Sequence, residues 1–194
     1  MYFVAVSFSD TKIRELFDLM RLVAEPDYAR SAHITLRGPY KQKKDISDSI
    51  FRKDVGKITL RKPGCFFENN QNTVFLNIEI FAISDSWWKP DFPNVTPHLT
   101  IYDGKDRETA WVIFNTLKTF SWQIRLNSSP MHILDKKRTI ENEFLTQYDK
   151  VSRTVSDVMG KDITPQEMRN LSLFDRVGVI KNVCQRIHKL SVDR

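Results

Sequence analysis

The first residues of the chain change from a strand-like to a helix-like hydrophobic pattern. Residues 2–8 are rich in Phe, Val and Tyr, which favours a β-strand. Over residues 10–24, apolar side chains then recur three and four positions apart, as they do on one face of a helix. Ser9 and Asp10 offer side-chain oxygens that can cap the first turn, and Pro26 ends the helix. We therefore predict a strand followed by an amphipathic helix.

Residues 32–134 predict mostly strands. A second strand is expected at 32–37, where Gly38-Pro39 should break it, and the polar, basic segment 41–54 should form a loop with a short helix. Further strands are expected at 57–67, 73–83, 97–102, 122–126 and 131–134, and a further helix at 105–119. The order strand, helix, strand thus occurs twice. It predicts an α+β fold whose core, residues 1–135, is a degenerate duplication.

The C-terminal residues 138–194 follow a helical pattern. Their two apolar stripes consist of Phe144, Tyr148, Val151, Val155 and Val158, and of Phe174, Val177, Ile180, Val183, Ile187 and Leu190. Gly160 can end the first helix, and Thr164-Pro165 can begin the next. We expect a C-terminal helical hairpin whose apolar faces pack on the core. The alternative is that these faces dock a partner protein or a second copy of the chain.

The composition is that of a folded globular protein. The chain has 194 residues, of which 41% are hydrophobic and 28% are charged. Its two cysteines are too few for a disulfide scaffold or a cysteine-based zinc site. No basic leader followed by an apolar segment begins the sequence, and no apolar run is long enough for a membrane span. We expect a protein of the cytoplasm that does not bind membranes.

Positive charge is concentrated in one stretch of the chain. The formal net charge is +6, and residues 37–62 contain nine Lys or Arg and three Asp, a surplus that equals the total. Such a surplus attracts partners that carry phosphate groups. The alternative is an ordinary solvated surface loop.

Two of the four histidines occur in the same four-residue pattern. The first is His33-Ile34-Thr35-Leu36, and the second, 65 positions later (98 minus 33), is His98-Leu99-Thr100-Ile101. On a strand, residues i and i+2 point to the same face about 6.6 Å apart. Each motif therefore presents a histidine and a threonine together, while its apolar residues can anchor the strand in the core.

These paired motifs resemble those of the two-histidine (2H) phosphoesterase superfamily, which includes the RNA 2′,3′-cyclic phosphodiesterases first described as 2′-5′ RNA ligases. The resemblance spans about residues 1–135. It implies a bilobal fold in which antiparallel sheets flank a central cleft that both motifs line. It also implies that His33 and His98 act as general acid and general base on one phosphodiester, and that Thr35 and Thr100 donate to its oxygens. Which histidine takes which role stays open.

The chemistry of histidine agrees with this division of roles. An imidazole titrates near pH 6.5, so its neutral and protonated forms coexist close to neutral pH. Each motif supplies one histidine, and the sequence contains neither His-x-His nor His-Glu-x-x-His. We therefore expect a reaction without a metal ion or another cofactor.

Three further residues are candidates for substrate binding. If the motif strands continue, Arg37 shares a face with His33 and could clamp a phosphate, and Tyr102 shares a face with His98 and could stack on a base. The alternative is that both are strand-end side chains that only reach solvent. Lys41 follows the first motif strand and could steer a polyanion. His132 lies in an alternating strand, and we interpret it as structural.

Together, these features predict a metal-independent phosphodiesterase that acts on a nucleotide or RNA, with a 2′,3′-cyclic phosphate as the favoured substrate. One alternative is a hydrolase of cyclic dinucleotides, cyclic oligonucleotides or 2′-5′ linkages. Another is an RNA-binding module without turnover, which the basic stretch 37–62 would serve.

Overall fold

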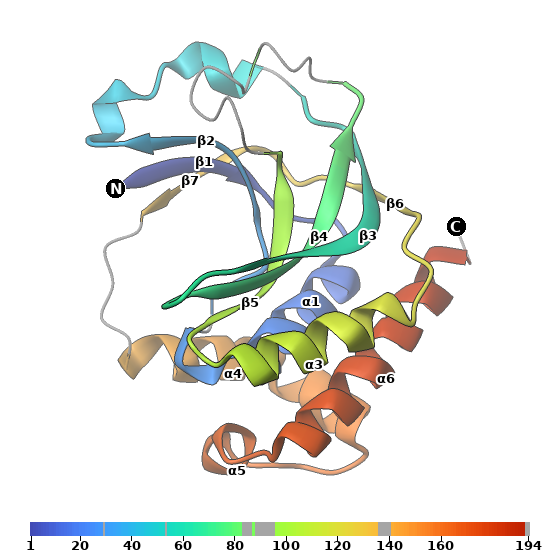
Figure 1. Ribbon diagram of the computed structural model, residues 1–194. Coiled ribbons are helices and arrows are strands. Elements are labelled where there is room, and N and C mark those ends of the chain that lie inside the picture. Colours follow the sequence, from blue (N-terminus) through green and yellow to red (C-terminus); the bar gives the residue numbers. More distant parts are fainter. Residues whose placement is uncertain (29, 53, 83–86, 88–95, 136–140, 193–194) are drawn as a thin grey trace.

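The computed structural model describes residues 1–28, 30–52, 54–82, 87, 96–135 and 141–192. These residues form one curled antiparallel sheet of seven strands, shaped like half a barrel, with helices against its convex side (Figure 1). The strand order is β6-β3-β4-β5-β2-β1-β7. The predicted mixture of helices and antiparallel strands is confirmed.

The elements lie close to the expected ranges. The strands are β1 (Tyr2–Val6), β2 (Ile34–Tyr40), β3 (Lys57–Phe67), β4 (Asn72–Ile80), β5 (His98–Gly104), β6 (Ile124–Asn127) and β7 (His132–Asp135). The α-helices are α1 (Thr11–Ala24), α3 (Arg107–Lys118), α4 (Glu141–Met159), α5 (Pro165–Arg169) and α6 (Leu173–Val192). Short 3₁₀ turns are η1 (Pro26–Tyr28), η2 (Lys43–Asp45) and η3 (Asp48–Arg52). No helix within the described ranges has the length and apolar character needed to cross a membrane.

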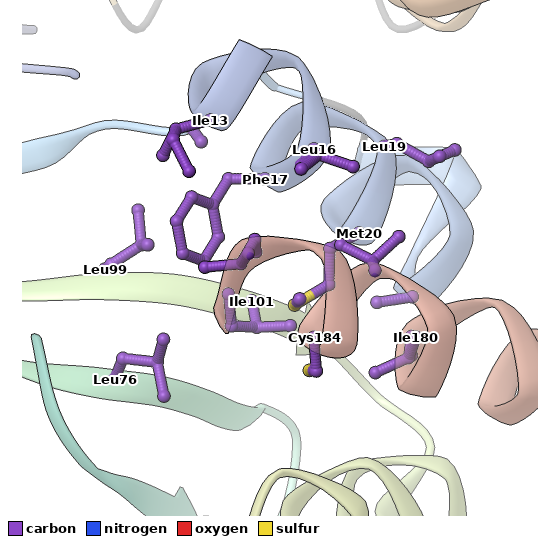
Figure 2. Packing of buried hydrophobic residues seen from close by; sticks show 14 of the residues in the cluster. Ile13, Leu16, Phe17, Leu19, Met20, Leu76, Leu99, Ile101, Ile180 and Cys184 are labelled. Atoms are coloured by element: carbon purple, nitrogen blue, oxygen red, sulfur yellow. The ribbon is translucent and has the colours of Figure 1, made fainter. Parts of the chain in front are cut away.

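Helix α1 forms the centre of the hydrophobic core. Asp10 caps it, with its Oδ1 accepting a hydrogen bond from the Ile13 amide at 2.8 Å. The apolar face of α1, which includes the fully buried Phe17, packs between the sheet and α6 (Figure 2). Burying one such side chain contributes about 1.5–3 kcal/mol. Because Leu99 and Ile101 of β5 belong to the same cluster, α1 anchors the second motif strand.

The C-terminal helices complete this core. Both α4 and α6 pack against α1, and their stripes join the same hydrophobic cluster as the sheet. Val151 and Val155 of α4 and Ile180 of α6 are buried, whereas Phe174 at the start of α6 is 86% exposed. The expectation that these stripes pack on the core is confirmed by this burial.

The first motif strand is longer than the sequence predicted. Gly38-Pro39 was expected to break it, but β2 continues through this pair to Tyr40, which lies opposite Tyr2 of β1. Gly38 has a φ of +123°, and a Cβ there would lie 2.9 Å from both the Phe3 ring and the Tyr2 carbonyl oxygen. A residue without a side chain lets the two strands approach at this point, so the prediction of a break is wrong.

Candidate active site

The two motif strands are direct neighbours at the centre of the sheet. Strands β2 and β5 pair antiparallel, with Ile34 opposite Leu99. Both of these apolar residues are fully buried in the core. His33 and Thr35 flank Ile34, and His98 and Thr100 flank Leu99. Because successive side chains of a strand alternate between its two faces, these histidines and threonines point to the opposite, concave face of the sheet.

This register relates the two motifs by a local two-fold arrangement. The recorded pair is Ile34 opposite Leu99, and β2 begins at Ile34, just after His33. Extended by one residue in each direction, a regular antiparallel ladder places His33 across from Thr100, and Thr35 across from His98. Directly opposite residues of such a ladder are about 4.5–5.5 Å apart, and diagonal ones about 7–8 Å. His33 and His98 stand on one diagonal, with the two threonines on the other. In this register, two segments far apart in sequence meet at the central pair of strands.

Both motif histidines are oriented by the same backbone contact. The Nδ1–H of His33 donates to the carbonyl oxygen of Ser31 at 2.7 Å, and that of His98 donates to the carbonyl of Thr96 at 3.1 Å. A carbonyl oxygen only accepts, so each Nδ1 carries the proton. In a neutral ring, the other nitrogen, Nε2, then has a free lone pair that can accept a proton.

Burial favours the neutral form of both rings. It lowers the pKa of His33 to about 3, and the nearby guanidinium group of Arg21 adds to this effect. Burial also lowers the pKa of His98, although the carboxylate of Asp103 partly opposes the change. At neutral pH, both imidazoles of the free protein are therefore uncharged.

An aromatic surface adjoins His98. Strand β4 places Asn77 opposite His98 and Phe75 opposite Thr100. The ring of Phe75 lies 4.7 Å from that of His98, centre to centre, and 4.8 Å from that of Phe66 on β3. Phe75 is buried, whereas Phe66 is half exposed. On this side the motif pair is bordered by flat, apolar rings.

A polar cavity adjoins His33 on the other side. It has a volume of about 430 Å³, and its lining includes His33, Thr35 and His132. Helix α4 adds Gln147 and Lys150 to the wall. Neither His98 nor Thr100, both in the described part of the chain, lines this cavity. The surroundings of the two histidines therefore differ chemically, although their motifs are alike.

The other predicted site residues lie in different surroundings. Arg37 is half-buried, like Thr35, and its guanidinium group lies 5.3 Å from the centre of the Trp87 ring. Lys41 is exposed just after β2. Neither position tests the binding role that we predicted.

Tyr102 does not share a face with His98. It is only 1% exposed, and its hydroxyl donates to the carbonyl oxygen of Asp106 at 3.0 Å. The strand pairing explains the difference. Val74 and Phe75 are adjacent in β4, but their partners in β5, Tyr102 and Thr100, are two positions apart, so β5 contains one extra residue here. This bulge reverses the alternation of side chains and turns Tyr102 into the core. The expectation that it stacks on a base is therefore wrong.

Two residues near the motifs were not predicted as site residues. His132 of β7 lines the cavity beside His33. Strands β7 and β2 lie on the two sides of β1, where His132 and Thr35 both pair with Ala5 and therefore share a face of the sheet. Phe66 lies beside Phe75 because β3 pairs with β4. The alternating pattern of each strand was visible in the sequence, but the order of the strands was not.

Within the described ranges, no group of three or more His, Cys, Asp or Glu side chains could hold a metal ion. No protein-family model matches this chain, and no curated protein matches it.

Proposed function

We propose that this chain is a metal-independent phosphodiesterase of the two-histidine type, acting on a nucleotide or RNA phosphodiester, with a 2′,3′-cyclic phosphate as the favoured substrate. One observation carries the proposal, namely the register that sets Ile34 opposite Leu99 and so gathers both His-x-Thr motifs on one face. A phosphate group between His33 and His98 would have an imidazole on each side and a hydroxyl donor beside each imidazole.

The proposed reaction is an in-line displacement at phosphorus. The Nε2 of one neutral imidazole takes a proton from water, and the water oxygen forms a new bond to phosphorus. The bond from phosphorus to a ribose oxygen breaks, and the other imidazole, protonated at Nε2, gives its proton to that oxygen. The Thr35 and Thr100 hydroxyls donate to the non-bridging oxygens, where negative charge increases in the transition state.

The lowered pKa values of the two histidines suit a general base, and the protonated histidine that acts as general acid would form when the substrate binds. Burial keeps both rings neutral in the free protein, because it lowers the pKa of His33 and of His98. An anionic phosphate placed between the rings favours the charged form of a neighbouring imidazole. One proton taken up with the substrate would then leave one ring neutral and one protonated.

The two-histidine assignment also implies an architecture. In this proposal, β1 and β2 with β7 form one lobe, and β4 and β5 with β3 and β6 form the other. The central pair of β2 and β5 is the junction of a duplicated, bilobal core. Helices α4, α5 and α6 then form a helical hairpin added to that core.

The test is an assay of 2′,3′-cyclic nucleotide hydrolysis in the presence of EDTA. We expect His33→Ala and His98→Ala each to lower kcat at least about 100-fold, because a positioned acid or base contributes about 10²–10⁴-fold. A matched control is His188→Gln, since His188 contacts the carbonyls of Cys184 and Ser121 in the packing of α6. Full activity of His98→Ala would remove the mechanism, and a requirement for added metal would remove its metal-free part.

The same assay separates the alternatives. Cyclic dinucleotides and 2′-5′-linked oligonucleotides, offered in parallel, test for another phosphodiester substrate. The basic stretch 37–62, with Lys41, Lys43 and Lys44 exposed, favours RNA binding as a second candidate function. RNA binding that weakens with salt and persists without turnover in the double histidine variant would support that candidate.

A further inference from the structure

An exposed phenylalanine stands beside the motif histidine of β5. Phe66 is 53% exposed, and its ring centre lies 6.4 Å from that of His98, with the two rings at 74° to each other. Its neighbour Phe75, which is 6% exposed, contacts both rings. The apolar surface of Phe66 is therefore continuous with the ring that the proposed mechanism uses.

A glycine on the same strand determines where Phe75 lies. Gly64 of β3 is opposite Phe75 of β4, and a Cβ at Gly64 would lie 2.5 Å from Cε2 of the Phe75 ring. The ring thus covers the glycine and extends across β3. Gly64 and Phe66 are two residues apart, so they share this face. The absence of a side chain at Gly64 brings the rings of Phe75 and Phe66 into contact.

We propose that Phe66, supported by Phe75, is the stacking site for the nucleobase of the substrate. The inference rests on the proposed function and names its substrate class as phosphodiesters that carry a base, rather than phosphorylated sugars. A nucleoside joins a flat aromatic ring to a phosphate, and the concave face offers an aromatic surface next to His98. The site also replaces Tyr102, which the sequence suggested for stacking and which the core buries.

The groups around these rings favour stacking over recognition of base edges. The Asn77 side-chain amide, opposite His98, donates to the Lys62 carbonyl oxygen at 2.7 Å and is engaged there. Base stacking on an aromatic side chain contributes about 1–3 kcal/mol and tolerates different bases. Purines should bind more tightly than pyrimidines, because they have the larger stacking area.

The experiment measures binding and turnover in Phe66→Ala and Phe66→Trp. Calorimetry with adenosine 2′-monophosphate should show Kd about 5- to 100-fold higher for Phe66→Ala, which corresponds to the loss of one stacked base. The tryptophan variant should retain binding. The matched control is Phe174→Ala, which removes an 86% exposed phenylalanine from α6. For turnover, kcat/KM for adenosine 2′,3′-cyclic phosphate should fall about 5- to 100-fold more than kcat/KM for ribose 2,3-cyclic phosphate.

The other possible results of this experiment bear either on the stacking site or on the proposed phosphodiesterase activity. Wild-type affinity in Phe66→Ala, equal losses on both substrates, or no binding of adenosine 2′-monophosphate by the wild type would overturn the stacking site. If binding depends on Phe66 but the wild type hydrolyses neither cyclic phosphate, the stacking site stands and the proposed phosphodiesterase activity fails.

Discussion

At the scale of single residues, the same kind of backbone hydrogen bond orients the rings of the two motif histidines. Each donates its Nδ1–H to the carbonyl oxygen two residues before it, Ser31 for His33 and Thr96 for His98. This contact uses only the local backbone, so it fixes the tautomer without help from another side chain. The other nitrogen of each ring, Nε2, is not used in this contact.

The lowered pKa of His33 predicts a loss of stability in acid. Its pKa is about 3 in the folded chain and about 6.5 when unfolded, so between these pH values the unfolded chain binds the extra proton. The free energy of unfolding should therefore fall as the pH drops below 6.5, by at most about 1.4 kcal/mol per pH unit. Between pH 7 and pH 5 the full loss would be about 2 kcal/mol, and solvent screening at this half-buried ring reduces it to roughly 1 kcal/mol.

Urea unfolding of the wild type and of His33→Gln at both pH values checks this prediction. The variant has no group that titrates at this position, so its stability should change less between pH 7 and pH 5. The nearby charged or titratable groups Arg21, Arg30 and His132 are present in both proteins. An identical pH dependence in the two proteins would show that His33 is not the group responsible.

At the scale of elements, α1 positions the start of the first motif. The Oδ1 of Asp18 accepts a hydrogen bond from the Ala32 amide at 2.5 Å, and Nη1 of Arg21 donates to the Ser31 carbonyl oxygen at 3.3 Å. That same carbonyl accepts from His33. Two adjacent turns of one helix thus hold the backbone that orients the imidazole, and both side chains are buried.

Asp18→Ala should destabilise the protein by about 1–3 kcal/mol, because it leaves the buried Ala32 amide without an acceptor. Asp18→Asn keeps an oxygen in place and should cost less. Chemical denaturation of both variants measures the difference. If the two variants are equally destabilised, the hydrogen bond to Ala32 is not the reason for the loss.

At the scale of the whole molecule, one hydrophobic cluster unites the sheet with the C-terminal helices. Helix α1 packs against α4 and α6 as well as against β5, and the cluster includes residues such as Met20, Val155 and Ile180. The surface that α1 buries is mostly apolar, with Asp18 and Arg21 as its charged residues. Removing the two helices would expose that surface to water.

A chain truncated after Asp135 should therefore lose its cooperative thermal unfolding, since the apolar side of α1 would be left uncovered. Calorimetry and near-UV circular dichroism of the truncated and complete chains test this. Cooperative unfolding of residues 1–135 alone would instead show that they form a core able to fold without the tail. The complete chain, measured at several concentrations for its mass in solution, tests the alternative that residues 138–194 dimerise.

The sequence alone determined most of the elements and the spacing of the residues within each motif. The spacing of Ile13, Phe17 and Met20 predicted α1, because a helix repeats every 3.6 residues whatever surrounds it. The period of two in a strand likewise placed each histidine beside its own threonine. These predictions succeeded because they depend on backbone geometry over a few residues.

The tertiary structure decided which of these elements meet. Strand pairing joins Ile34 to Leu99 and brings Phe66 and His132 near the motifs, although they are far apart along the chain. An extra residue in β5 turns Tyr102 inward, and the small Gly38 lets β2 run on. Strand order, bulges and close approaches arise from the packing of the whole core, so no local pattern encodes them.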